Sequence, residues 1–361
     1  MCSAFSDLGV EVTLSVPFNE NSNNSEINRR YGALDFNIIF QDRYTSSARL
    51  EKYINFYKVK KHIDEVNPDV CMVRTPLLLK YLKSFHIPYI FEVHNNIFNY
   101  RFRIFDNYLK KVIKDASESE YCIKMLSISD NLKKYWISKG IAEDSIQVLH
   151  DGFNEKYYLP SRSIEEARNK LNIPHNRKIV TYTGSLYENR GIENIINLAG
   201  EIGEADFYII GGPEENKIKY ENIAKSKDTN NIKFVGHVGH TEIPDYLYAS
   251  DVLLALWSDN VKTINYCSPL KIFEYMAAGR IIVAHEYPTI KEVLTNGEDA
   301  ILVNPSSITD LKKSVKKAIT MNYTNKMADN SRNRAFQKYS WKLRAKGILD
   351  LIHQYNDIGV I

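Results

Sequence analysis

The sequence has no run of about 18 or more apolar residues, and no basic stretch followed by an apolar one opens the chain. The first absence argues against a transmembrane helix and the second against a secretory signal, so we expect a cytoplasmic protein. Cysteine is also scarce. Cys2, Cys71, Cys122 and Cys267 are far apart and fit neither a metal-ligand nor a C-x-x-C spacing. We therefore expect reduced thiols rather than a disulfide or zinc framework.

An excess of charge of one sign is missing too. The chain has 47 basic and 44 acidic side chains, a net charge of +3, which argues against a nucleic-acid partner. Apolar residues make up 44% and charged residues 25% of the chain, as in ordinary folded proteins, which excludes global disorder. A length of 361 residues predicts two domains, each able to bury a core.

What the sequence does contain is a regular alternation of short apolar runs and longer amphipathic runs. The predicted strands cover residues 10–16, 35–40, 69–73, 88–93, 124–128 and 145–149, then 178–183, 206–210, 231–235, 251–256, 280–284 and 300–303. Helical patterns lie between them, for example over 49–66 and 131–139. Runs such as IVTYTG and IIVAHE barely alternate, which is typical of parallel strands covered on both faces. The pattern predicts two doubly wound, Rossmann-like α/β domains.

The domain boundary is predicted between 150 and 177, a stretch with two prolines, an Asp-Gly pair and no strand-like run. The first domain has an unusual start. CSAFSDLG resembles the end of a helix, so the usual first strand and glycine-rich turn are expected to be missing. A misassigned start, a truncation and a lost strand would all produce this pattern.

The most informative stretch is YCSPLKIFEYMAAG, residues 266–279. Ser268 is a favourable N-cap and Pro269 a favourable first helical residue, which predicts a helix start. The free amides of its first turn, at Leu270 and Lys271, would form an anion site.

Two charged residues on this helix point to a ligand. Lys271 lies where the helix dipole disfavours a cation, which indicates a bound anion nearby. Glu274 follows one turn later and would accept hydrogen bonds from a pair of sugar hydroxyls. The alternative is a capped helix that simply packs on a sheet.

The stretch TGSLYENRG, residues 183–191, joins an apolar strand to an amphipathic helix, where α/β sheets bind ligands. Gly184 permits a sharp turn, and Arg190 could bind a phosphate with two hydrogen bonds. The sequence contains neither GxxxxGK[ST] nor a complete GxGxxG, which argues against a Walker loop and a nicotinamide dehydrogenase. Arg190 as an ordinary surface arginine remains the alternative.

Two further strand ends carry candidate site residues. In FEVHN, Glu92 and His94 point to the same side of a strand, and His94 could reach a crevice or simply cap its own loop. In FVGHV, the backbone at His237 and Val238 follows a glycine and could read the edge of a base. A simple strand-to-loop turn would give the same pattern.

In this order, the segments resemble the retaining glycosyltransferases of family 4, also called glycosyl transferases group 1, which have the GT-B fold. The resemblance runs through TYTGSLYENRGIENII, FYIIGGPEE, IKFVGHVGHTEIPDYLYASDVLL, SPLKIFEYMAAGRIIVA and IKEVLTNGEDAILV, and covers residues 178–304. LGVEVTL, PYIFEVH and LSISDNLKKYWISKGIAEDSIQVLHDGFN give weaker parallels in the first half.

The resemblance implies two Rossmann-like domains that face each other across a cleft. They would be an acceptor-side domain over 1–155, a donor-binding domain over 156–340 and a closing helix over 341–361. It assigns ribose binding to Glu274, and diphosphate binding to Arg190 and the amides near Leu270. The backbone at His237 and Val238 would recognise the base. His94 would lie near the transferred sugar. The predicted donor-binding residues are Gly184, Ser185, Arg190, His237, Val238, Tyr266, Ser268, Pro269, Leu270, Lys271 and Glu274, and the predicted catalytic residues are His94 and Arg190.

This sequence departs from the family pattern at two of these positions. Tyr266 stands where the motif Glu-x7-Glu has its first glutamate, which affects the geometry around the donor sugar. Ser185 stands where an arginine often follows the loop glycine, so the diphosphate has one cation fewer.

The resemblance implies transfer of a sugar from a nucleoside-diphosphate sugar, such as a UDP-sugar, to a hydroxyl acceptor with retention of anomeric configuration. The expected setting is the biosynthesis of a cell-surface polysaccharide or glycolipid, with a glycan or lipid-linked acceptor. No Asp-x-Asp pair lies at a suitable strand end, so we expect no required metal and no cofactor. The alternatives are an impaired donor-binding module, and an epimerase or phosphorylase of the same fold.

Basic and aromatic residues alternate over 49–61 and again in YRFRIFDNYLKK, residues 100–111. Such helices could hold the first domain on an anionic lipid surface, as a peripheral protein on the cytoplasmic face of the membrane. The alternative is a solvated helix face.

Overall fold

The computed structural model describes residues 1–17, 35–41, 58–96, 103–261, 263–321 and 326–357. The chain divides into two compact units. The first comprises Met1–His150, Tyr266–Ser268 and Trp341–Ile361, and the second comprises Asp151–Asn265 and Pro269–Ser340. In the described part of the chain, no helix is both long and apolar enough to cross a membrane.

All twelve predicted strands are present, with bounds that differ from the prediction by a few residues. In the first unit they are β1 (Thr13–Pro17), β2 (Asn37–Gln41), β3 (Cys71–Val73), β4 (Tyr89–Val93), β5 (Cys122–Ser127) and β6 (Ile146–Val148). In the second unit they are β7 (Lys178–Thr183), β8 (Ala205–Ile210), β9 (Ile232–Gly236), β10 (Val252–Ala255), β11 (Ile281–His285) and β12 (Ile301–Val303).

The first unit contains two parallel sheets. One pairs β1 with β2, and the other has the order β3-β4-β5-β6. Its helices are α1 (Cys2–Ser6), α4 (Pro76–Ser84), α5 (Arg103–Ser117), α6 (Asp130–Ile137), the 3-10 turn η1 (Glu143–Ser145) and α16 (Trp341–Asp357). Of the helix predicted over 49–66, residues 58–66 are helical and 49–57 lie outside the described residues.

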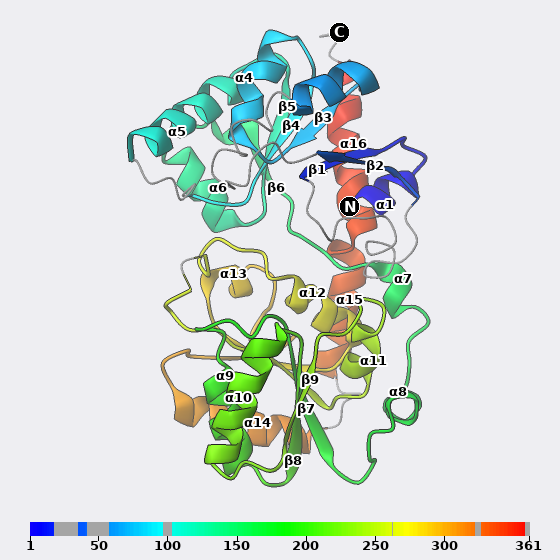
Figure 1. Ribbon diagram of the computed structural model, residues 1–361, viewed down its shortest axis with the longest axis vertical. Coiled ribbons are helices and arrows are strands. Elements are labelled where there is room, and N and C mark those ends of the chain that lie inside the picture. Colours follow the sequence, from blue (N-terminus) through cyan, green and yellow to red (C-terminus); the bar gives the residue numbers. More distant parts are fainter. Residues whose placement is uncertain (18–34, 42–57, 97–102, 262, 322–325, 358–361) are drawn as a thin grey trace. The chain divides into compact units, whose positions relative to one another are not determined.

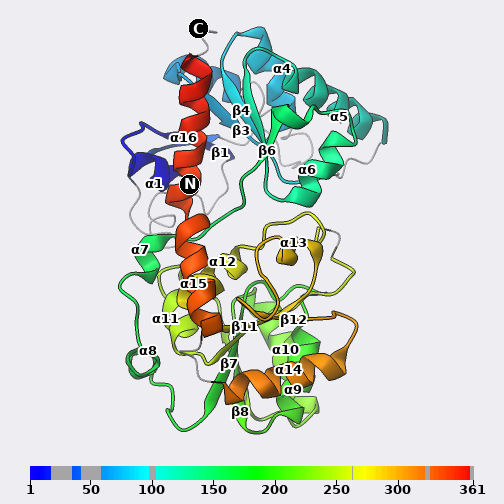
Figure 2. The same ribbon diagram turned by 180° about the vertical axis from the view of Figure 1, so that it is seen from behind.

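Alternation along β4 divides the core of the first unit between two faces. Tyr89, Phe91 and Val93 belong to the core that includes residues of α4, α5 and α6. Ile90 belongs to the opposite core, which includes residues of α16. Figure 2 shows α16 in red beside α1, with α4 and α5 on the other side of the sheet. Glu92, in phase with Ile90, is therefore placed towards α16.

The second unit is a single parallel sheet of six strands in the order β12-β11-β10-β7-β8-β9. Its helices are α7 (Glu155–Tyr158), α8 (Ile164–Leu171), α9 (Ile192–Glu201), α10 (Glu214–Ser226), α11 (Ile243–Tyr248), α12 (Leu270–Ala278), α13 (Pro288–Lys291), α14 (Ile308–Thr320) and α15 (Lys326–Lys338) (Figure 1). The chain runs from β7 outward through β8 to β9, and then returns to start again at β10 on the other side of β7. The order therefore reverses between β7 and β10, which makes their carboxyl ends a topological switch point.

The inner strands of this sheet are buried on both faces, as their unalternating sequences predict. Every residue of β10 and β11 is buried, and so is every residue of β7 after Lys178. The predicted apolar stripe of α9 is buried as well, with Ile192, Ile195, Ile196 and Ala199 in the core.

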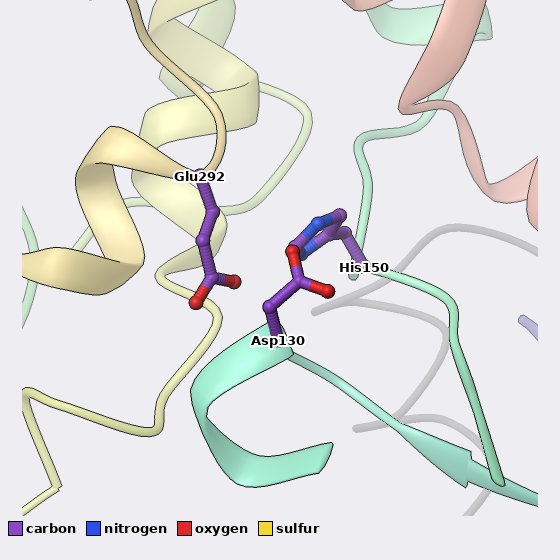
Figure 3. A group of neighbouring side chains, drawn as sticks. All are labelled: Asp130, His150 and Glu292. Carbon is purple, nitrogen blue, oxygen red and sulfur yellow. The ribbon is translucent and has the colours of Figure 1, made fainter. Parts of the chain in front are cut away.

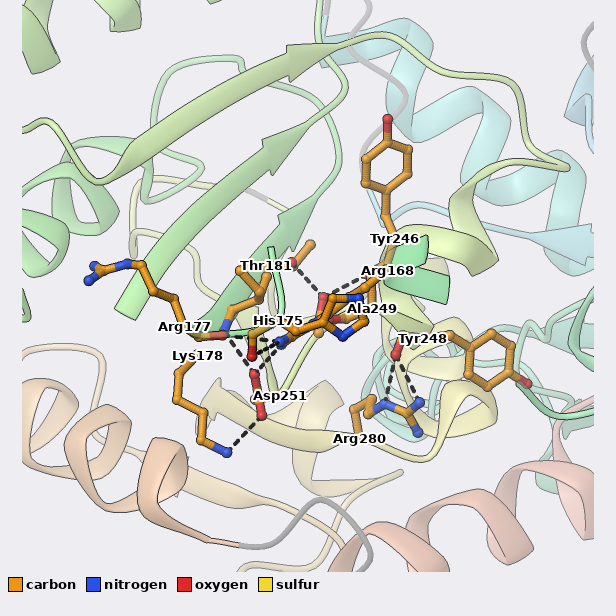
Figure 4. Close-up of polar contacts among 12 residues, drawn as sticks. Arg168, His175, Arg177, Lys178, Thr181, Tyr246, Tyr248, Ala249, Asp251 and Arg280 are labelled. Carbon is orange, nitrogen blue, oxygen red and sulfur yellow. Dashed lines mark hydrogen bonds and ion pairs between the residues drawn. The ribbon is translucent and has the colours of Figure 1, made fainter. Parts of the chain in front are cut away.

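A buried ion pair joins the amino ends of β7 and β10 (Figure 4). Arg168 of α8 donates from Nη2 to Asp251 Oδ2 over 2.7 Å, and the amide of Ile179 donates to the same oxygen over 2.8 Å. Lys178 Nζ lies 2.9 Å from Asp251 Oδ1, and Arg168 Nε donates to the carbonyl of Ala249 over 2.9 Å. One carboxylate thus accepts from α8 and from β7, at the edge of the sheet opposite the switch point.

Candidate functional site

The loop after β7 is built on two glycines with positive φ. Gly184 has φ +142°, and its amide donates to the carbonyl of Ile210 over 2.9 Å. Gly191, at the N-cap of α9, has φ +79°, and a Cβ there would lie 2.9 Å from Leu256 Cβ. Both positions therefore require glycine, and the loop between them begins at the switch point.

Helix α12 starts slightly later than the sequence predicts. Ser268 is predicted as the N-cap, but the helix begins at Leu270 and Pro269 occupies the N-cap with ψ 108°. Its extended ψ keeps Pro269 out of the first helical turn, although its ring would suit that position. The prediction that Ser268 caps the helix and that Pro269 is its first helical residue is therefore wrong. As the N-cap residue, Pro269 gives this end of α12 no side-chain hydrogen bond.

Lys271, in the first turn of α12, extends towards aromatic rings at the switch point. Its Nζ lies 3.8 Å from the ring centroid of Tyr182 in β7 and 5.2 Å from that of Trp257, which follows β10. Burial, reinforced by the charge of Arg190 and opposed by that of Glu274, lowers the pKa of Lys271 to about 7. Lys271, predicted to lie where the helix dipole disfavours a cation, therefore contacts the faces of aromatic rings and not a carboxylate.

Glu274 lies one turn further along α12, and like Lys271 it is half-buried. Burial raises the pKa of its carboxyl to about 7, and the nearby Lys271 opposes that rise. Among the residues that the structure describes, no ion pair within 4.0 Å joins Glu274 to a cation. Near neutral pH, the carboxyl of Glu274 and the amine of Lys271 are therefore both partly protonated.

Arg190 lies in the loop directly before Gly191 and is half-buried. Its positive charge contributes to the lowered pKa of Lys271 and opposes the rise that burial causes in the pKa of Tyr182. In the described ranges Arg190 has no carboxylate partner within ion-pair distance. Arg190, Lys271 and Glu274 thus form a group in which two cations have no counter-ion, at the carboxyl end of β7.

Ser185 and the predicted base-reading residues lie on the same unit. The carbonyl of Ser185 accepts a hydrogen bond from the hydroxyl of Tyr182 over 3.2 Å. His237 and Val238 follow β9, where Gly236 has φ +88° and its carbonyl accepts from the amide of Gly211 over 2.7 Å. His237 is exposed and Val238 half-buried, so this segment is at the surface of the carboxyl edge.

Tyr266 belongs to the first unit, together with Ser268. Its carbonyl accepts a hydrogen bond from Ser129 Oγ over 2.8 Å, and its ring packs edge-on against that of Tyr135, with centroids 6.1 Å apart. Ser129 also caps α6, accepting from the amide of Leu132 over 3.2 Å. The sequence gives no indication that Tyr266 packs on α6.

Figure 3 shows Asp130 and His150, two polar residues of the first unit. Asp130 is the first residue of α6, and His150 follows β6. The ring of His150 hydrogen-bonds through Nδ1 to the carbonyl of Ile128 over 3.1 Å. The third residue of that figure, Glu292, belongs to the second unit.

His94, the predicted catalytic residue of the first unit, lies directly after β4 and contacts the carboxylate of Glu92 through Nε2. Glu92 is fully buried and also forms ion pairs with Arg74, at 2.6 Å, and with Arg344 of α16, at 2.7 Å. Burial alone would raise the pKa of Glu92, but the hydrogen bond from His94 and the charges of Arg344 and Arg74 lower it to about 2. Sequence reasoning placed Glu92 beside His94 and missed both arginines.

Two family models match the chain. The model described as glycosyl transferases group 1 matches residues 163–337, and that described as glycosyltransferase family 4 matches residues 1–157. The chain belongs to glycosyltransferase family 4. Its fold is the GT-B fold of two Rossmann-like domains.

Relatives and solved structures agree with this family. The chain is 24% identical to a putative colanic acid biosynthesis glycosyl transferase of Escherichia coli, over 59% of this chain and 53% of that protein. It is 23% identical to a glycosyltransferase of Methanocaldococcus jannaschii, over 81% of this chain and 77% of that protein. The chain thus spans about half the length of the first relative.

Two solved structures illustrate the likeness in fold. Sucrose-phosphate synthase of Thermosynechococcus elongatus has a TM-score of 0.78 at 15% identity, covering 99% of this chain and 92% of that chain. HepE of Anabaena, solved with UDP and glucose, has a TM-score of 0.68 at 16% identity, covering 94% and 91%. At these identities the likeness concerns the fold alone.

Proposed function

We propose that this protein transfers a sugar from a nucleoside-diphosphate sugar to a hydroxyl acceptor. The observation that carries the proposal is the proximity of Arg190 and Lys271, two basic side chains at the switch point of the second unit that form no ion pair with a carboxylate in the described part of the chain. A diphosphate supplies the missing negative charge. The structures of HepE with UDP, and with UDP and glucose, support a nucleotide-sugar donor.

Each predicted donor-binding residue has a role in this proposal. Arg190, Lys271 and the amide of Leu270 bind the diphosphate, beside the backbone of Gly184 and Ser185. Glu274 accepts hydrogen bonds from the ribose hydroxyls, and the backbone at His237 and Val238 reads the base. Tyr266, Ser268 and Pro269 form the segment that leads into the diphosphate-binding turn.

The proposed reaction retains the anomeric configuration and needs no metal ion or cofactor. The bond between the sugar's anomeric carbon and the diphosphate oxygen breaks, and the acceptor oxygen bonds to that carbon from the same face. The acceptor's proton passes to an oxygen of the departing diphosphate. Arg190, Lys271 and the α12 amides stabilise the charge that develops there. His94, the other predicted catalytic residue, keeps in this proposal the place near the transferred sugar that the family resemblance implies.

The acceptor we propose is a glycan or lipid-linked hydroxyl in the biosynthesis of a surface polysaccharide or glycolipid. The relative from colanic acid biosynthesis supports this setting. We place the protein in the cytoplasm, peripherally on an anionic membrane. The described part of α5 carries Lys110, Lys111 and Lys114, and residues 49–57 and 97–102 lie outside the described ranges. Co-sedimentation with anionic vesicles at low salt tests the attachment, and its absence there contradicts it.

Calorimetry with UDP, GDP and ADP tests the donor site directly. We expect at least one of the three to bind the full-length protein, and Arg190→Ala to weaken that binding. Lys317→Ala is the matched control. It removes an exposed lysine in the last turn of α14, and a helix after a parallel strand ends at the edge opposite the carboxyl ends. If none of the nucleotides binds, the proposed function is wrong. Binding without any donor turnover would favour a donor-binding module.

A further inference from the structure

Lys271 reaches across from α12 to the loop after β7. A Cβ on Gly184 would lie 2.8 Å from Lys271 Nζ, so the amine lies directly against the backbone of the loop glycine. The next residue in the loop, Ser185, carries no charge. Lys271 therefore places an ionisable nitrogen beside Gly184 and Ser185, a part of the loop that has no charged side chain.

The surroundings of this amine come from four elements. Tyr182 of β7 and Trp257 after β10 present aromatic rings, Arg190 of the loop adds a positive charge, and Glu274 of α12 adds a titratable carboxyl. No carboxylate within 4.0 Å pairs with Lys271 in the part of the chain that the structure describes. A half-buried ammonium beside a guanidinium, with only π faces to contact, is poorly compensated.

A diphosphate would reverse this balance. Its negative charge beside Arg190 and Lys271 favours the protonated amine, since an opposite charge within about 4–6 Å stabilises the charged form. The amine would then also donate hydrogen bonds to phosphate oxygens. Binding of a diphosphate would thus convert the amine that contacts it to its charged form.

We propose that Lys271 is the second cation of the diphosphate site, beside Arg190, and that its amine takes up a proton from solvent when a nucleoside diphosphate binds. This inference rests on the proposed function, because it assigns a chemical event to the same donor site. The atom balance is simple: the neutral amine and one proton become the ammonium, and no other bond changes. Donor affinity then depends on pH through Lys271.

The choice of pH and the Glu274→Gln variant together separate Lys271 from its titratable neighbours. With a pKa of about 7, roughly one Lys271 in ten is protonated at pH 8, so binding would take up as much as about 0.9 proton. Glu274, also with a pKa of about 7, is roughly nine-tenths ionised at pH 8, and a diphosphate nearby would raise its pKa too, so Glu274→Gln is needed to remove any uptake by this carboxyl. The terminal phosphate of UDP, with a second pKa of about 6, is already ionised there. The lowered pKa values of His240 and His285 keep those rings neutral.

The experiment is calorimetry of UDP binding at pH 8 in two buffers of different ionisation enthalpy, Tris and HEPES. We expect the full-length protein to take up about 0.5–0.9 proton per UDP. Lys271→Met should bind about 10- to 150-fold more weakly and take up almost no proton. Lys271→Arg keeps a permanent charge, so it should bind UDP without proton uptake, and it carries the test if Lys271→Met fails to fold. Glu274→Gln and the control Lys317→Ala should retain the uptake.

Affinity across pH gives an independent measurement. Above pH 7 the UDP affinity of the parent should fall by up to about tenfold per pH unit, and that of Lys271→Arg should stay flat. UDP binding without proton uptake, or uptake that persists in Lys271→Met or Lys271→Arg, overturns the inference and leaves the proposed function standing. Failure of UDP, GDP and ADP to bind overturns both.

Discussion

Arg344, near the start of the last helix, forms an ion pair with Glu92 in β4, with Nη2 2.7 Å from Oε2. Both side chains are buried, with 3% and 0% of their surfaces exposed. The same guanidinium donates to the carbonyl of Leu149 at the end of β6 over 3.2 Å. One side chain from the end of the sequence thus neutralises a buried carboxylate and satisfies a strand end of the first unit.

We predict that Arg344→Leu destabilises the first unit by about 3–5 kcal/mol, because it leaves the carboxylate of Glu92 buried with less compensation. The midpoint of urea unfolding, followed by tryptophan fluorescence and circular dichroism, measures the change. Glu118→Gln is a control, since its side chain, directly after α5, is 60% exposed. A midpoint as little affected in Arg344→Leu as in the control would contradict this assignment.

The pair also predicts a dependence of stability on pH. The pKa of Glu92 is lowered to about 2 in the folded protein, so it binds fewer protons than in the unfolded chain. Its stabilising contribution is therefore complete above the unfolded pKa of about 4.5 and is lost as pH falls towards 2. Glu92→Gln should flatten the slope of unfolding free energy against pH between pH 5 and pH 3. Much of the interval between the unfolded pKa of about 4.5 and the folded pKa of about 2 lies in this range. An unchanged slope would show that other carboxyls account for it.

Gly184→Ala should weaken donor binding and lower stability by about 1–3 kcal/mol. Alanine resists the φ of +142°, and its Cβ would have to displace the amine of Lys271. Gly203→Ala is the matched control, because nothing lies within 4 Å of a Cβ at that position. Thermal unfolding and UDP calorimetry on both variants decide the matter. Equal behaviour of the two would mean that the loop tolerates a side chain.

Arg190→Ala and Glu274→Gln should fail in different ways. The charge on the diphosphate grows as the sugar leaves, so Arg190→Ala should lower both turnover and donor affinity, by about 10- to 150-fold. The ribose does not change during the reaction, so Glu274→Gln should mainly raise the KM for the donor. Steady-state kinetics with calorimetry separates the two effects. Folded variants that both bind donor like the parent would show that the donor site lies elsewhere.

The first-formed product should keep the anomeric configuration of its donor. This follows from the proposed transfer on the leaving-group face, in which the diphosphate accepts the acceptor's proton. Proton NMR of the product before mutarotation gives the anomeric coupling constant. A coupling constant of the inverted anomer would refute retention.

The sequence predicts the strands well because most are short apolar runs bounded by polar loops, and burial on both faces keeps such runs recognisable. It predicts that Gly184, Arg190 and Glu274 are neighbours only because their segments follow the order of the family's motifs. The environment of Lys271 depends on Tyr182 and Trp257, which three separate segments bring together, and no local pattern encodes that contact. The predicted helix start at Ser268 is wrong because Pro269 has an extended ψ of 108°, which a proline ring permits as readily as a helical one. The pairing of Arg344 with Glu92 joins two residues far apart in the sequence, and their spacing along the chain does not indicate that they are in contact.

The carboxylate of Asp251 has a consequence for how this domain can change. It joins the amino ends of β7 and β10, and Arg190 and Lys271 of the proposed donor site lie at the carboxyl end of β7, a six-residue strand. At about 3.3 Å per residue, the two ends of β7 are about 20 Å apart, and two unit charges at that distance interact by less than about 1 kcal/mol at an effective dielectric constant of about 20. Charge substitutions around Asp251 therefore have only a small electrostatic effect at Lys271, while the strands still hold the loop in place. Thermal tolerance and donor preference can evolve in this unit as two separate traits.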